Sequence, residues 1–444
     1  MGLSIAVPAP VQTLLQRLNG AGFAAYAVGG CVRDSLLGRA PQDWDICTAA
    51  RPEETAACFS DLRTILTGAR YGTVTVLYED IPYEITTFRA EEGYSDCRHP
   101  DAVRFLPALE GDLARRDFTV NAMAADSAGR VTDCCGGLED LRQGRIRCVG
   151  DPEQRFQEDA LRILRGLRFA ARFDFSIDPA TGAAIHALAP LLGRVAPERL
   201  SKELTGLLCG PGAGRILGEY GDVLTLLIPE LGPCRGFVQY NPHHIFDVWT
   251  HILHVLEGVP PRPELRLAAL LHDVGKPACF TMDKNLVGHF SGHAVAGAAM
   301  AEDILRRLRF DGHTVQTVTR LVRRHDRDLP RTARAMSRML GEFGEDTVRD
   351  LLLLRAADRM GKGTEPAEAV QADLETATAL LEQVLAAKTC FSLRHLAVNG
   401  RDLTALGMAP GPALGRTLQA LLAAVMEERV PNEREALLEL ARKS

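Results

Sequence analysis

Two aspartates separated by one residue, Asp43 and Asp45, are the first side chains in the chain that point to catalysis. In an extended strand, residues two apart face the same side, so both carboxylates would converge on one place. Carboxylates that close repel each other unless a cation lies between them, and Mg²⁺ prefers such oxygen ligands. We therefore predict that this pair holds Mg²⁺ while a hydroxyl attacks a phosphate and pyrophosphate leaves. A solvated Asp-x-Asp at a strand end is the alternative that the motif alone leaves open.

Two glycines, Gly29 and Gly30, precede this pair, between an expected strand and an expected helix. Such a turn lets backbone N–H groups approach a triphosphate, and Arg33 adds a fork of donors. A Gly-Gly pair is also compatible with an ordinary turn. Glu84, on a later strand, is expected either to complete the metal site as a third carboxylate or to point outward from an amphipathic strand.

The elements that must position these residues can be read from periodicity. Residues 10–20 predict an amphipathic helix, and residues 23–28 predict a strand that runs into the glycines. Residues 74–78 and 83–88 alternate apolar and polar side chains around Glu79-Asp80, which predicts a β-hairpin. Strand signals stop after about residue 150, and the remainder is helical in pattern. The predicted fold class is therefore an α/β head with a small mixed sheet, followed by an all-α neck, body and tail.

The order of a glycine turn, an arginine and an Asp-x-Asp pair resembles the head of the polymerase-β-type nucleotidyltransferases. The version here is similar to the class II tRNA nucleotidyltransferases, the CCA-adding enzymes, and to bacterial poly(A) polymerases. The residues that carry this resemblance are Gly29, Gly30, Arg33, Asp34, Asp43 and Asp45. Residues 115–124 resemble the block of that family that contacts the ribose, which implies nucleotide contacts for Arg116, Asp117 and Asn121. Residues 136–152 resemble its hinge between head and neck.

The segment 158–168 supplies the most informative helical pattern, because Asp159, Arg162, Arg165 and Arg168 step by three along an expected helix face. A carboxylate that accepts from an exocyclic amino group, with an arginine that donates to a ring nitrogen, would accept C and A and refuse U and G. The resemblance assigns this base reading to Asp159 and Arg162, and implies nucleotide contacts for Arg165 and Arg168. A solvated basic helix face is the alternative.

A polar loop at residues 91–100 looks like the flexible loop of those family members that add the final A. Its presence favours complete CCA addition over addition of C alone. Residues 197–204 resemble the last neck motif, which we interpret as structural, with a phosphate contact from Arg199 as a further possibility.

A second constellation of metal-ligand residues lies in the helical body. His251, followed by His272-Asp273, resembles the pattern of the HD-type metal-dependent phosphohydrolases. Mixed nitrogen and oxygen ligands favour Mn²⁺, Ni²⁺ or Mg²⁺ over a structural zinc. The resemblance implies the ligand set His251, His272, Asp273 and Asp358, with His293 and His325 as extra ligands of two-metal members. A decayed site that remains only as scaffold is the alternative. His243, His244 and His254 are interpreted as ordinary helix or loop residues.

Length and composition exclude several classes of protein. The chain has 444 residues, a formal net charge of −6, 46% hydrophobic residues and 11 cysteines without a Cys-x-x-Cys pair. No apolar run is long enough for a membrane span, and the N-terminal residues lack the features of a secretory signal, so we expect a cytoplasmic protein with reduced thiols. The acidic net charge means that any contact with a polyanion must be local. Four segments are predicted: a head (1–150), a neck (151–235), an HD-like domain (236–365) and a tail with tRNA contacts (366–444).

The leading hypothesis is template-independent addition of C, C and A to the 3′ end of tRNA from CTP and ATP. A poly(A) polymerase or an enzyme that adds only A is the nearest alternative. An HD-type phosphodiesterase whose head only positions RNA, and a non-catalytic RNA-binding protein, belong to other classes; both are disfavoured by the intact Asp43 and Asp45. The oligomeric state is left open.

Overall fold

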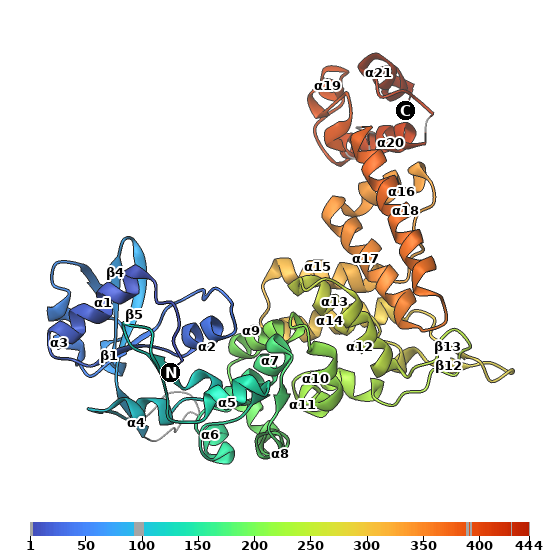
Figure 1. The fold of residues 1–444 in the computed structure, drawn as a ribbon. Helices are drawn as coiled ribbons and strands as arrows, with labels where there is room; N and C mark the ends of the chain where they lie inside the picture. The colour runs from blue at the N-terminus through green and yellow to red at the C-terminus, as the bar shows by residue number, and fades with distance from the viewer. Residues whose placement is uncertain (1–2, 93–101, 388–389, 391–392, 428, 444) are drawn as a thin grey trace. The chain divides into compact units, whose positions relative to one another are not determined.

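The structure, a computed structural model, describes residues 3–92, 102–387, 390, 393–427 and 429–443. It divides into two compact units, Met1–Pro229 (unit 1) and Glu230–Ser444 (unit 2) (Figure 1). The finer boundaries after residues 150 and 365 remain predictions. Most of the polar loop expected at 91–100 lies outside the described residues.

Unit 1 begins with one mixed sheet. Its strands are β1 (Ala25–Val28), β2 (Ile46–Thr48), β3 (Arg63–Ile65), β4 (Thr73–Tyr78), β5 (Ile81–Thr87), β8 (Met123–Ala125) and β9 (Val131–Asp133). They follow the order β3-β4-β5-β2-β1-β8-β9. The β2–β5 pair is parallel, and the other neighbours are antiparallel. A separate hairpin pairs β6 (Arg89–Glu92) with β7 (Ala102–Phe105).

Short helices accompany this sheet: α1 (Ala9–Gly20), α2 (Gly30–Leu36), α3 (Pro52–Cys58), α4 (Leu109–Ala114), α5 (Gly137–Arg142), η1 (Ala69–Tyr71) and η2 (Thr119–Asn121). The alternation of side chains along β1 and β2 creates two cores, as the period of a strand requires. Ala27 and Ile46 pack with the apolar face of α1. Val28 and Cys47 pack instead with Leu113 of α4. The sheet that carries Asp43 and Asp45 is therefore buried on both faces.

The sequence predictions for the head are confirmed in their main features. The helix expected at 10–20 is α1, and the strand expected at 23–28 is β1. The hairpin expected around Glu79-Asp80 is β4–β5, and both turn residues have positive φ angles of 52° and 62°. Aspartate tolerates this left-handed conformation better than most residues, because its short side chain bonds locally, which suits Asp80.

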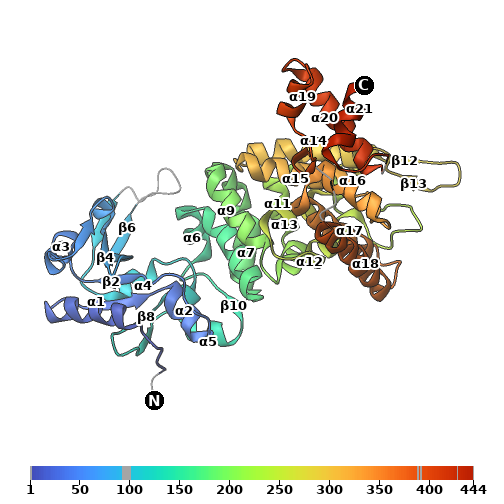
Figure 2. The same cartoon turned by 90° about the horizontal axis from the view of Figure 1, so that it is seen from above.

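The neck is helical: α6 (Pro152–Glu158), α7 (Leu161–Phe173), α8 (Pro179–Leu188), η3 (Ala189–Arg194), α9 (Pro197–Leu208), α10 (Ala213–Glu219) and α11 (Gly221–Leu227). Helices α7 and α9 lie side by side (Figure 2). Gly166 lets α7 approach the head closely, since a Cβ there would lie 3.1 Å from the Phe118 ring. Nearly all of the non-arginine side chains of α7 are buried, which confirms the apolar stripe in its sequence.

Two expectations about this region are wrong. Strands do occur after residue 150, because β10 (Arg145–Ile146) pairs with β11 (Ser176–Ile177), and β12 (Thr281–Met282) pairs with β13 (Gly288–His289). Residues 158–168 are not one helix either. Asp159 has extended backbone angles (φ −140°, ψ 103°), and its carboxylate accepts a hydrogen bond from the Leu161 N–H. The extended backbone of Asp159 and this local hydrogen bond interrupt the helical pattern, so α6 ends before Asp159 and α7 begins at Leu161.

Unit 2 is helical apart from the β12–β13 hairpin. Its helices are α12 (Val248–Gly258), α13 (Pro263–Leu271), α14 (His293–Arg307), α15 (Gly312–Arg324), α16 (Ala333–Phe343), α17 (Glu345–Gly361), α18 (Ala367–Ala386), α19 (Gly400–Ala405), α20 (Pro412–Met426) and α21 (Arg434–Lys443), with the short turns η5 (Pro277–Cys279) and η6 (Leu393–His395). Another short turn, η4 (Pro229–Cys234), spans the boundary of the units. No described helix is long and apolar enough to cross a membrane.

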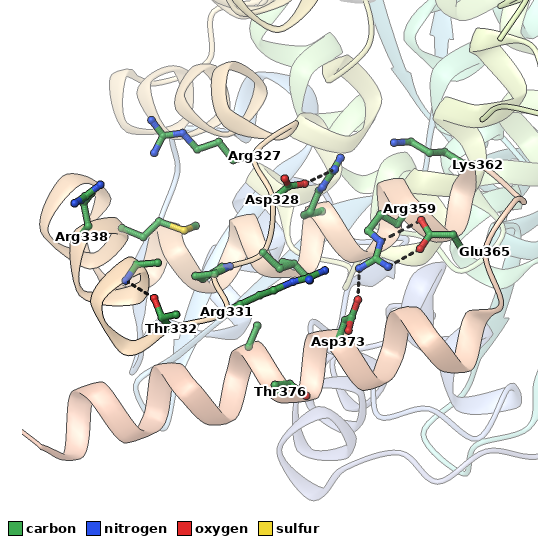
Figure 3. A pocket seen from close by; sticks show the side chains of 16 residues that line it. Arg327, Asp328, Arg331, Thr332, Arg338, Arg359, Lys362, Glu365, Asp373 and Thr376 are labelled. Atoms are coloured by element: carbon green, nitrogen blue, oxygen red, sulfur yellow. Dashed lines mark hydrogen bonds and ion pairs between the residues drawn. The ribbon is translucent and has the colours of Figure 1, made fainter. Parts of the chain in front are cut away.

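Two features of unit 2 matter for function. Helices α19, α20 and α21 close around a small core of their own, with Leu403, Leu421 and Leu437 at its centre. Helices α16, α17 and α18 and the loop before α16 line a cavity of about 1180 Å³ (Figure 3).

Candidate functional site

The head carboxylates lie at the start of strand β2. Asp43 and Asp45 precede its first residue, Ile46, so they are not inside the strand as expected but directly before it. The backbone C=O of Asp45 accepts a hydrogen bond from the Val28 N–H, which ties this segment to β1. Strand β2 runs parallel to β5 with Ile46 opposite Ile85, and this register places Asp45 beside Glu84. The sheet thus brings the three predicted metal ligands to one edge.

These acids are exposed and have no compensating cation in direct contact. Among the described residues, none donates a hydrogen bond to Asp43, Asp45 or Glu84 or forms an ion pair with them. The protein around Asp45 raises the pKa of its carboxyl by partial desolvation, and the charges of Glu84 and Asp43 raise it further. Arg116 only partly opposes these effects. Hard oxygen donors whose mutual repulsion is uncompensated fit a divalent cation such as Mg²⁺.

The glycine turn next to this edge has the conformation that the sequence predicts. Gly29 has a φ of 81°, and α2 begins at Gly30. A Cβ at position 29 would lie only 3.0 Å from Nη1 of Arg116. The positive φ and this close approach together explain why glycine is required there.

Arg33, expected to meet the triphosphate, is buried between head and neck. Its guanidinium forms an ion pair with Asp34 at 2.7 Å, donates to Asn121 Oδ1, and stacks on the rings of Phe169 and Phe173. Burial lowers the pKa of Arg33, and the charge of Asp34 partly restores it. The structure therefore brings two predicted nucleotide residues, Arg33 and Asn121, into one contact.

Arg116, in the block at 115–121, forms an ion pair with an acid that precedes the block. Arg116 Nη2 donates to Asp112 Oδ2 at 3.1 Å, and Asp112 is fully buried. Burial raises the pKa of the Asp112 carboxyl, but Arg115 and Arg116 outweigh that effect and lower it. The sequence reasoning missed Asp112, although an acid three and four residues before two arginines on a helix is a recognisable signal.

Asp117 joins head and neck through Arg165. Two nitrogens of Arg165, Nε and Nη2, donate to Asp117 Oδ2 at 2.9 and 2.7 Å. The other oxygen accepts from the Phe118 N–H at 2.8 Å and from Asn121 Nδ2 at 3.2 Å. Although burial raises the pKa of Asp117, these donors lower it to about 2.

This low pKa gives a testable stability prediction. A carboxyl whose pKa falls from 3.8 to about 2 on folding stabilises the fold by roughly 2 kcal/mol above pH 4. That contribution is present while the group is ionised in both states and is lost as the pH falls from 4 through 2. Asp117→Asn is therefore expected to lower the free energy of unfolding by about 2 kcal/mol at pH 7.

The measurement is urea unfolding followed by the fluorescence of the two tryptophans, Trp44 and Trp249, with Asp80→Asn at the exposed hairpin tip as the matched control. The difference in the free energy of unfolding between wild type and Asp117→Asn should stay constant from pH 7 to 4.5 and become smaller below pH 4. A difference that grew as the pH fell would contradict the lowered pKa of Asp117.

The predicted base-reading pair, Asp159 and Arg162, is held by other partners. Asp159 Oδ2 accepts from Arg199 Nη2 at 2.9 Å. Arg162 Nη1 donates to Glu158 Oε2 at 2.6 Å and to the Arg155 C=O at 3.2 Å. Arg199, for which the sequence suggested a phosphate contact, here orients the Asp159 carboxylate.

Arg168 completes the row of neck arginines. Its Nε donates to Glu203 on α9, and its guanidinium stacks on Phe169 with 4.2 Å to the ring centroid. Arg165 also approaches Glu203, with an Nη1–Oε1 distance of 3.8 Å. Glu203 is a missed residue, and no local signal could have found it, because it lies 35 positions from Arg168.

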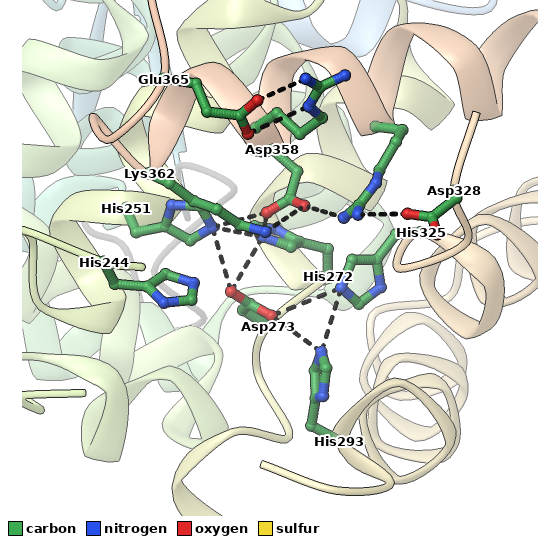
Figure 4. Close-up of polar contacts among 12 residues, drawn as sticks. His244, His251, His272, Asp273, His293, His325, Asp328, Asp358, Lys362 and Glu365 are labelled. Atoms are coloured by element: carbon green, nitrogen blue, oxygen red, sulfur yellow. Dashed lines mark hydrogen bonds and ion pairs between the residues drawn. The ribbon is translucent and has the colours of Figure 1, made fainter. Parts of the chain in front are cut away.

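The four core residues of the second constellation meet inside unit 2 (Figure 4). His251 comes from α12, His272 and Asp273 follow α13, and Asp358 comes from α17; all four are buried. His251 Nε2 lies 3.2 Å from both Asp273 Oδ2 and Asp358 Oδ1. His272 Nε2 lies 3.2 Å from Asp273 Oδ2 and 3.1 Å from His251 Nε2. Four residues spread over 108 positions of sequence thus converge in one cluster.

The two extra residues face the other oxygen of the same aspartate. His293 Nε2 lies 3.4 Å from Asp273 Oδ1, His325 Nε2 lies 3.6 Å from it, and the two histidine nitrogens are 3.3 Å apart. The ligand atoms of His251, His272 and Asp273 lie within 4.8 Å of one another, as do those of Asp273, His293 and His325. Asp273 is therefore shared between two adjacent candidate metal sites.

The histidine rings are oriented by backbone carbonyls. Nδ1 of His272, of His293 and of His325 each lies 2.7–2.8 Å from the C=O three residues earlier, in Ala269, Phe290 and Val322. A carbonyl only accepts, so each Nδ1 carries the proton and each Nε2 presents its lone pair toward Asp273. This is the arrangement in which neutral histidines bind metals.

The charges at this cluster also fit divalent cations. Neither carboxylate oxygen of Asp273 accepts a hydrogen bond of good geometry, although Lys276 Nζ forms an ion pair at 2.7 Å. Burial lowers the pKa of His251, but Asp273 and Asp358 outweigh it and raise the pKa to about 9. Buried acids that force a proton onto a histidine would be satisfied as well by a metal ion.

A cavity of about 280 Å³ opens onto the cluster and is lined by three cations. They are Lys276, Arg355 and Lys362; Arg355 and Lys362 lie 2.7 and 3.3 Å from Asp358 Oδ2. His244 lines the same cavity, 3.4 Å from Lys276 Nζ, and its pKa falls to about 3 through burial and the charge of Lys276. His244, interpreted from the sequence as an ordinary helix or loop residue, does lie in a loop, but the fold brings that loop to this cavity.

Most of the chain matches known protein families. Residues 25–147 match the family described as the poly A polymerase head domain. Residues 174–231 match an RNA- and SrmB-binding site of polymerase A, and residues 293–441 match domain 2 of tRNA nucleotidyltransferases.

Full-length relatives agree with these matches. The CCA-adding enzyme of Limosilactobacillus fermentum is 36% identical over 434 residues, which is 97% of this chain and 96% of that protein. The CCA-adding enzyme of Enterococcus faecalis is 34% identical over 97% of this chain and 94% of its own length. The crystal structure of the Bacillus stearothermophilus CCA-adding enzyme in complex with CTP matches with a TM-score of 0.71 and 30% identity, over 98% of this chain and 99% of that one.

Proposed function

The chain belongs to the CCA-adding enzymes, the tRNA nucleotidyltransferases, and from that premise we propose which of its residues carry out each part of the reaction. It adds C, C and A to the 3′ end of tRNA from CTP and ATP without a nucleic-acid template. In each step the RNA 3′-hydroxyl attacks the α-phosphate of the nucleotide, a new P–O bond forms, and pyrophosphate leaves. The observation that carries the proposal is the sheet edge at which Asp43, Asp45 and Glu84 meet beside the glycine turn.

The head residues would position the reacting phosphates. Asp43 and Asp45, with Glu84 as a third ligand, are the residues that would hold Mg²⁺, which when bound lowers the pKa of the attacking hydroxyl and neutralises charge on the phosphates. The N–H of Gly30 and the guanidinium of Arg33 would bind the triphosphate. Arg116, Asp117 and Asn121 would orient the sugar.

The activity itself is tested with tRNA that ends at the discriminator base, in the presence of Mg²⁺ and each nucleotide alone or together. Growth by three residues that needs both CTP and ATP is the expected result. Long A-tails on unrelated RNA would instead identify a poly(A) polymerase, and addition of one A to tRNA ending in CC, without use of CTP, would identify an A-adding enzyme.

The neck would read the base. We propose that Asp159 accepts a hydrogen bond from the exocyclic amino group of C or A, and that Arg162 donates to the ring nitrogen. Arg165 and Arg168 would contact the nucleotide beside them. Their pairing with Asp117 and Glu203 fixes the row of arginines before a nucleotide binds.

Asp159→Ala is therefore expected to relax the rejection of UTP and GTP. Loss of one charge-assisted hydrogen bond corresponds to roughly 1.5–3 kcal/mol, so the ratio of kcat/KM for UTP to that for CTP should rise about tenfold or more. Glu153→Ala, an exposed acid on α6, is the control and should leave the ratio unchanged. An Asp159→Ala enzyme as selective as wild type would remove Asp159 from the role of base reader.

The cluster in unit 2 supports a second activity, hydrolysis of a phosphate ester. We propose that His251, His272, Asp273 and Asp358 hold one divalent metal ion and that Asp273, His293 and His325 hold a second, with Mn²⁺, Ni²⁺ and Mg²⁺ as candidates. Lys276, Arg355 and Lys362 would bind the oxygens of the phosphate that enters the adjoining cavity. Water oxygen then bonds to phosphorus, the ester P–O bond breaks, and the departing alcohol takes up a proton.

A further inference from the structure

The larger cavity of unit 2 adjoins the smaller cavity over the cluster that would hold two metals. It has a volume of about 1180 Å³ and is lined from the loop at 327–332 and from α16, α17 and α18. Arg355 and Lys362 line both this cavity and the smaller one over the cluster. The two spaces therefore share two cationic side chains in their lining, of which Lys362 is labelled in both Figure 3 and Figure 4.

Helix α17 arranges its cations in a row. Arg355, Arg359 and Lys362 are four and three residues apart, so they share one face of the helix. The first and last residues of this row, Arg355 and Lys362, both pair with Asp358, one of the candidate metal ligands. Arg359 is neutralised within the large cavity by Glu365 and by Asp373, the latter at 2.7 Å.

The charge of the large cavity is not balanced. Its lining has six cationic and three acidic side chains, and the acids are engaged: Glu365 and Asp373 by Arg359, and Asp328 by Arg355 at 3.3 Å. Arg331 and Arg338, by contrast, have no hydrogen-bond or ion-pair partner among the described residues. Two unpaired arginines in one cavity favour an anion with several oxygens, and phosphate matches their planar donors.

The size of the cavity indicates more than an isolated phosphate. Pockets for small organic ligands occupy roughly 300–1,000 Å³, and this cavity of about 1180 Å³ exceeds that range. Leu329, Pro330 and Met339 give it an apolar portion beside the arginines. An organic body with a phosphate at one end would satisfy both parts of the lining.

We propose that this cavity binds a second phosphate group of the molecule that is hydrolysed at the two-metal cluster. The substrate class is a nucleoside phosphate ester with two separate phosphates: one enters the small cavity for hydrolysis, and the other is bound by Arg331 and Arg338. A free nucleoside bisphosphate and the phosphorylated terminal nucleotide of an RNA strand share this chemistry. The inference rests on the hydrolytic activity proposed above for the same cluster.

The first test measures binding without metal and without turnover. Adenosine 3′,5′-bisphosphate is titrated into chelator-treated protein by calorimetry, for wild type, for Arg331→Ala/Arg338→Ala and for Arg334→Ala. Arg334 is an exposed arginine on α16, the helix that carries Arg338, and it does not line the cavity. We expect binding to this cavity to weaken about tenfold or more in the double variant, because two charge-assisted contacts are lost. Arg334→Ala should bind as wild type does, and equal affinity in all three proteins would overturn the proposal.

The second test measures preference during hydrolysis with Mn²⁺. The ratio of kcat/KM for adenosine 3′,5′-bisphosphate to that for 3′-AMP or 5′-AMP should exceed one in wild type and fall about tenfold in the double variant. A short oligonucleotide with a terminal phosphate, compared with the free bisphosphate, identifies the source of the second phosphate. Arg331→Lys/Arg338→Lys should recover part of the ratio, because the charges remain.

The two tests distinguish failure of the proposed hydrolytic function from failure of the second-phosphate proposal. If wild type hydrolyses none of these esters with any of the three metals, the proposed hydrolytic function fails, while arginine-dependent binding in the first test would still establish the anion site. A wild-type ratio of one, with active hydrolysis, would overturn the second-phosphate proposal itself.

Discussion

Asp43→Asn is expected to lower kcat/KM for addition of C and A to tRNA by about 1,000-fold, because it removes one of the three carboxylates proposed to hold the catalytic cation. The substitution keeps the shape of the side chain and removes only its charge. Asp43 is exposed and has no partner among the described residues, so the fold should not depend on it. The measurement is single-turnover extension of tRNA with labelled CTP.

Asp80→Asn is the matched control for this variant. It makes the same chemical change at the exposed tip of the β4–β5 hairpin and should leave addition at the wild-type rate. The phosphate-ester hydrolysis proposed for unit 2 should persist in Asp43→Asn. If both activities fell together, the assignment of two separate sites would be wrong.

Asp273→Asn is expected to have the second large effect, a loss of metal binding in unit 2 by at least about 100-fold together with loss of hydrolysis. Asp273 faces both histidine pairs, through Oδ2 on one side and Oδ1 on the other. The measurement is the content of bound Mn²⁺ after dialysis. Addition of nucleotides to tRNA should continue.

His293→Ala supplies an informative companion, since it alters only the second group of ligands. It should lower the stoichiometry from two ions to one, whereas the exposed Asp303→Asn should leave it at two. Because Asp273 is buried beside cations, its variant must first be shown to melt cooperatively. One ion in folded wild type, unchanged in His293→Ala, would contradict the shared-aspartate arrangement.

Local patterns predicted much of the head. The alternation around Glu79-Asp80 placed the hairpin, and the spacing of Asp43 and Asp45 placed both acids at one sheet edge. Periodicity did not predict the helix break at Asp159, because its three-residue steps also fit an uninterrupted helix. The break depends on a hydrogen bond from the Leu161 N–H to that one carboxylate, which competes with helix geometry.

Contacts between distant segments were the part that sequence could not supply. The HD-like motif predicted six candidate ligands, and their side chains do come together in the structure. Motif spacing said nothing about His244, which reaches the cluster from an irregular loop, or about Glu203, which binds Arg168 across α7 and α9. Pairings of this kind arise from helix packing, and a single sequence carries no record of them.

The ion pairs of the neck have a consequence for accuracy over repeated additions. A free arginine side chain has roughly 2 kcal/mol of rotamer entropy to lose when it is fixed. In this chain Arg162, Arg165 and Arg168 are already fixed by Glu158, Asp117 and Glu203. In the role proposed for the neck, an incoming nucleotide would therefore meet arginines that are already paired, and little of its binding energy would be needed to order them. In the base-reading role proposed for the neck, these ion pairs would present the arginines already ordered at each of the three additions.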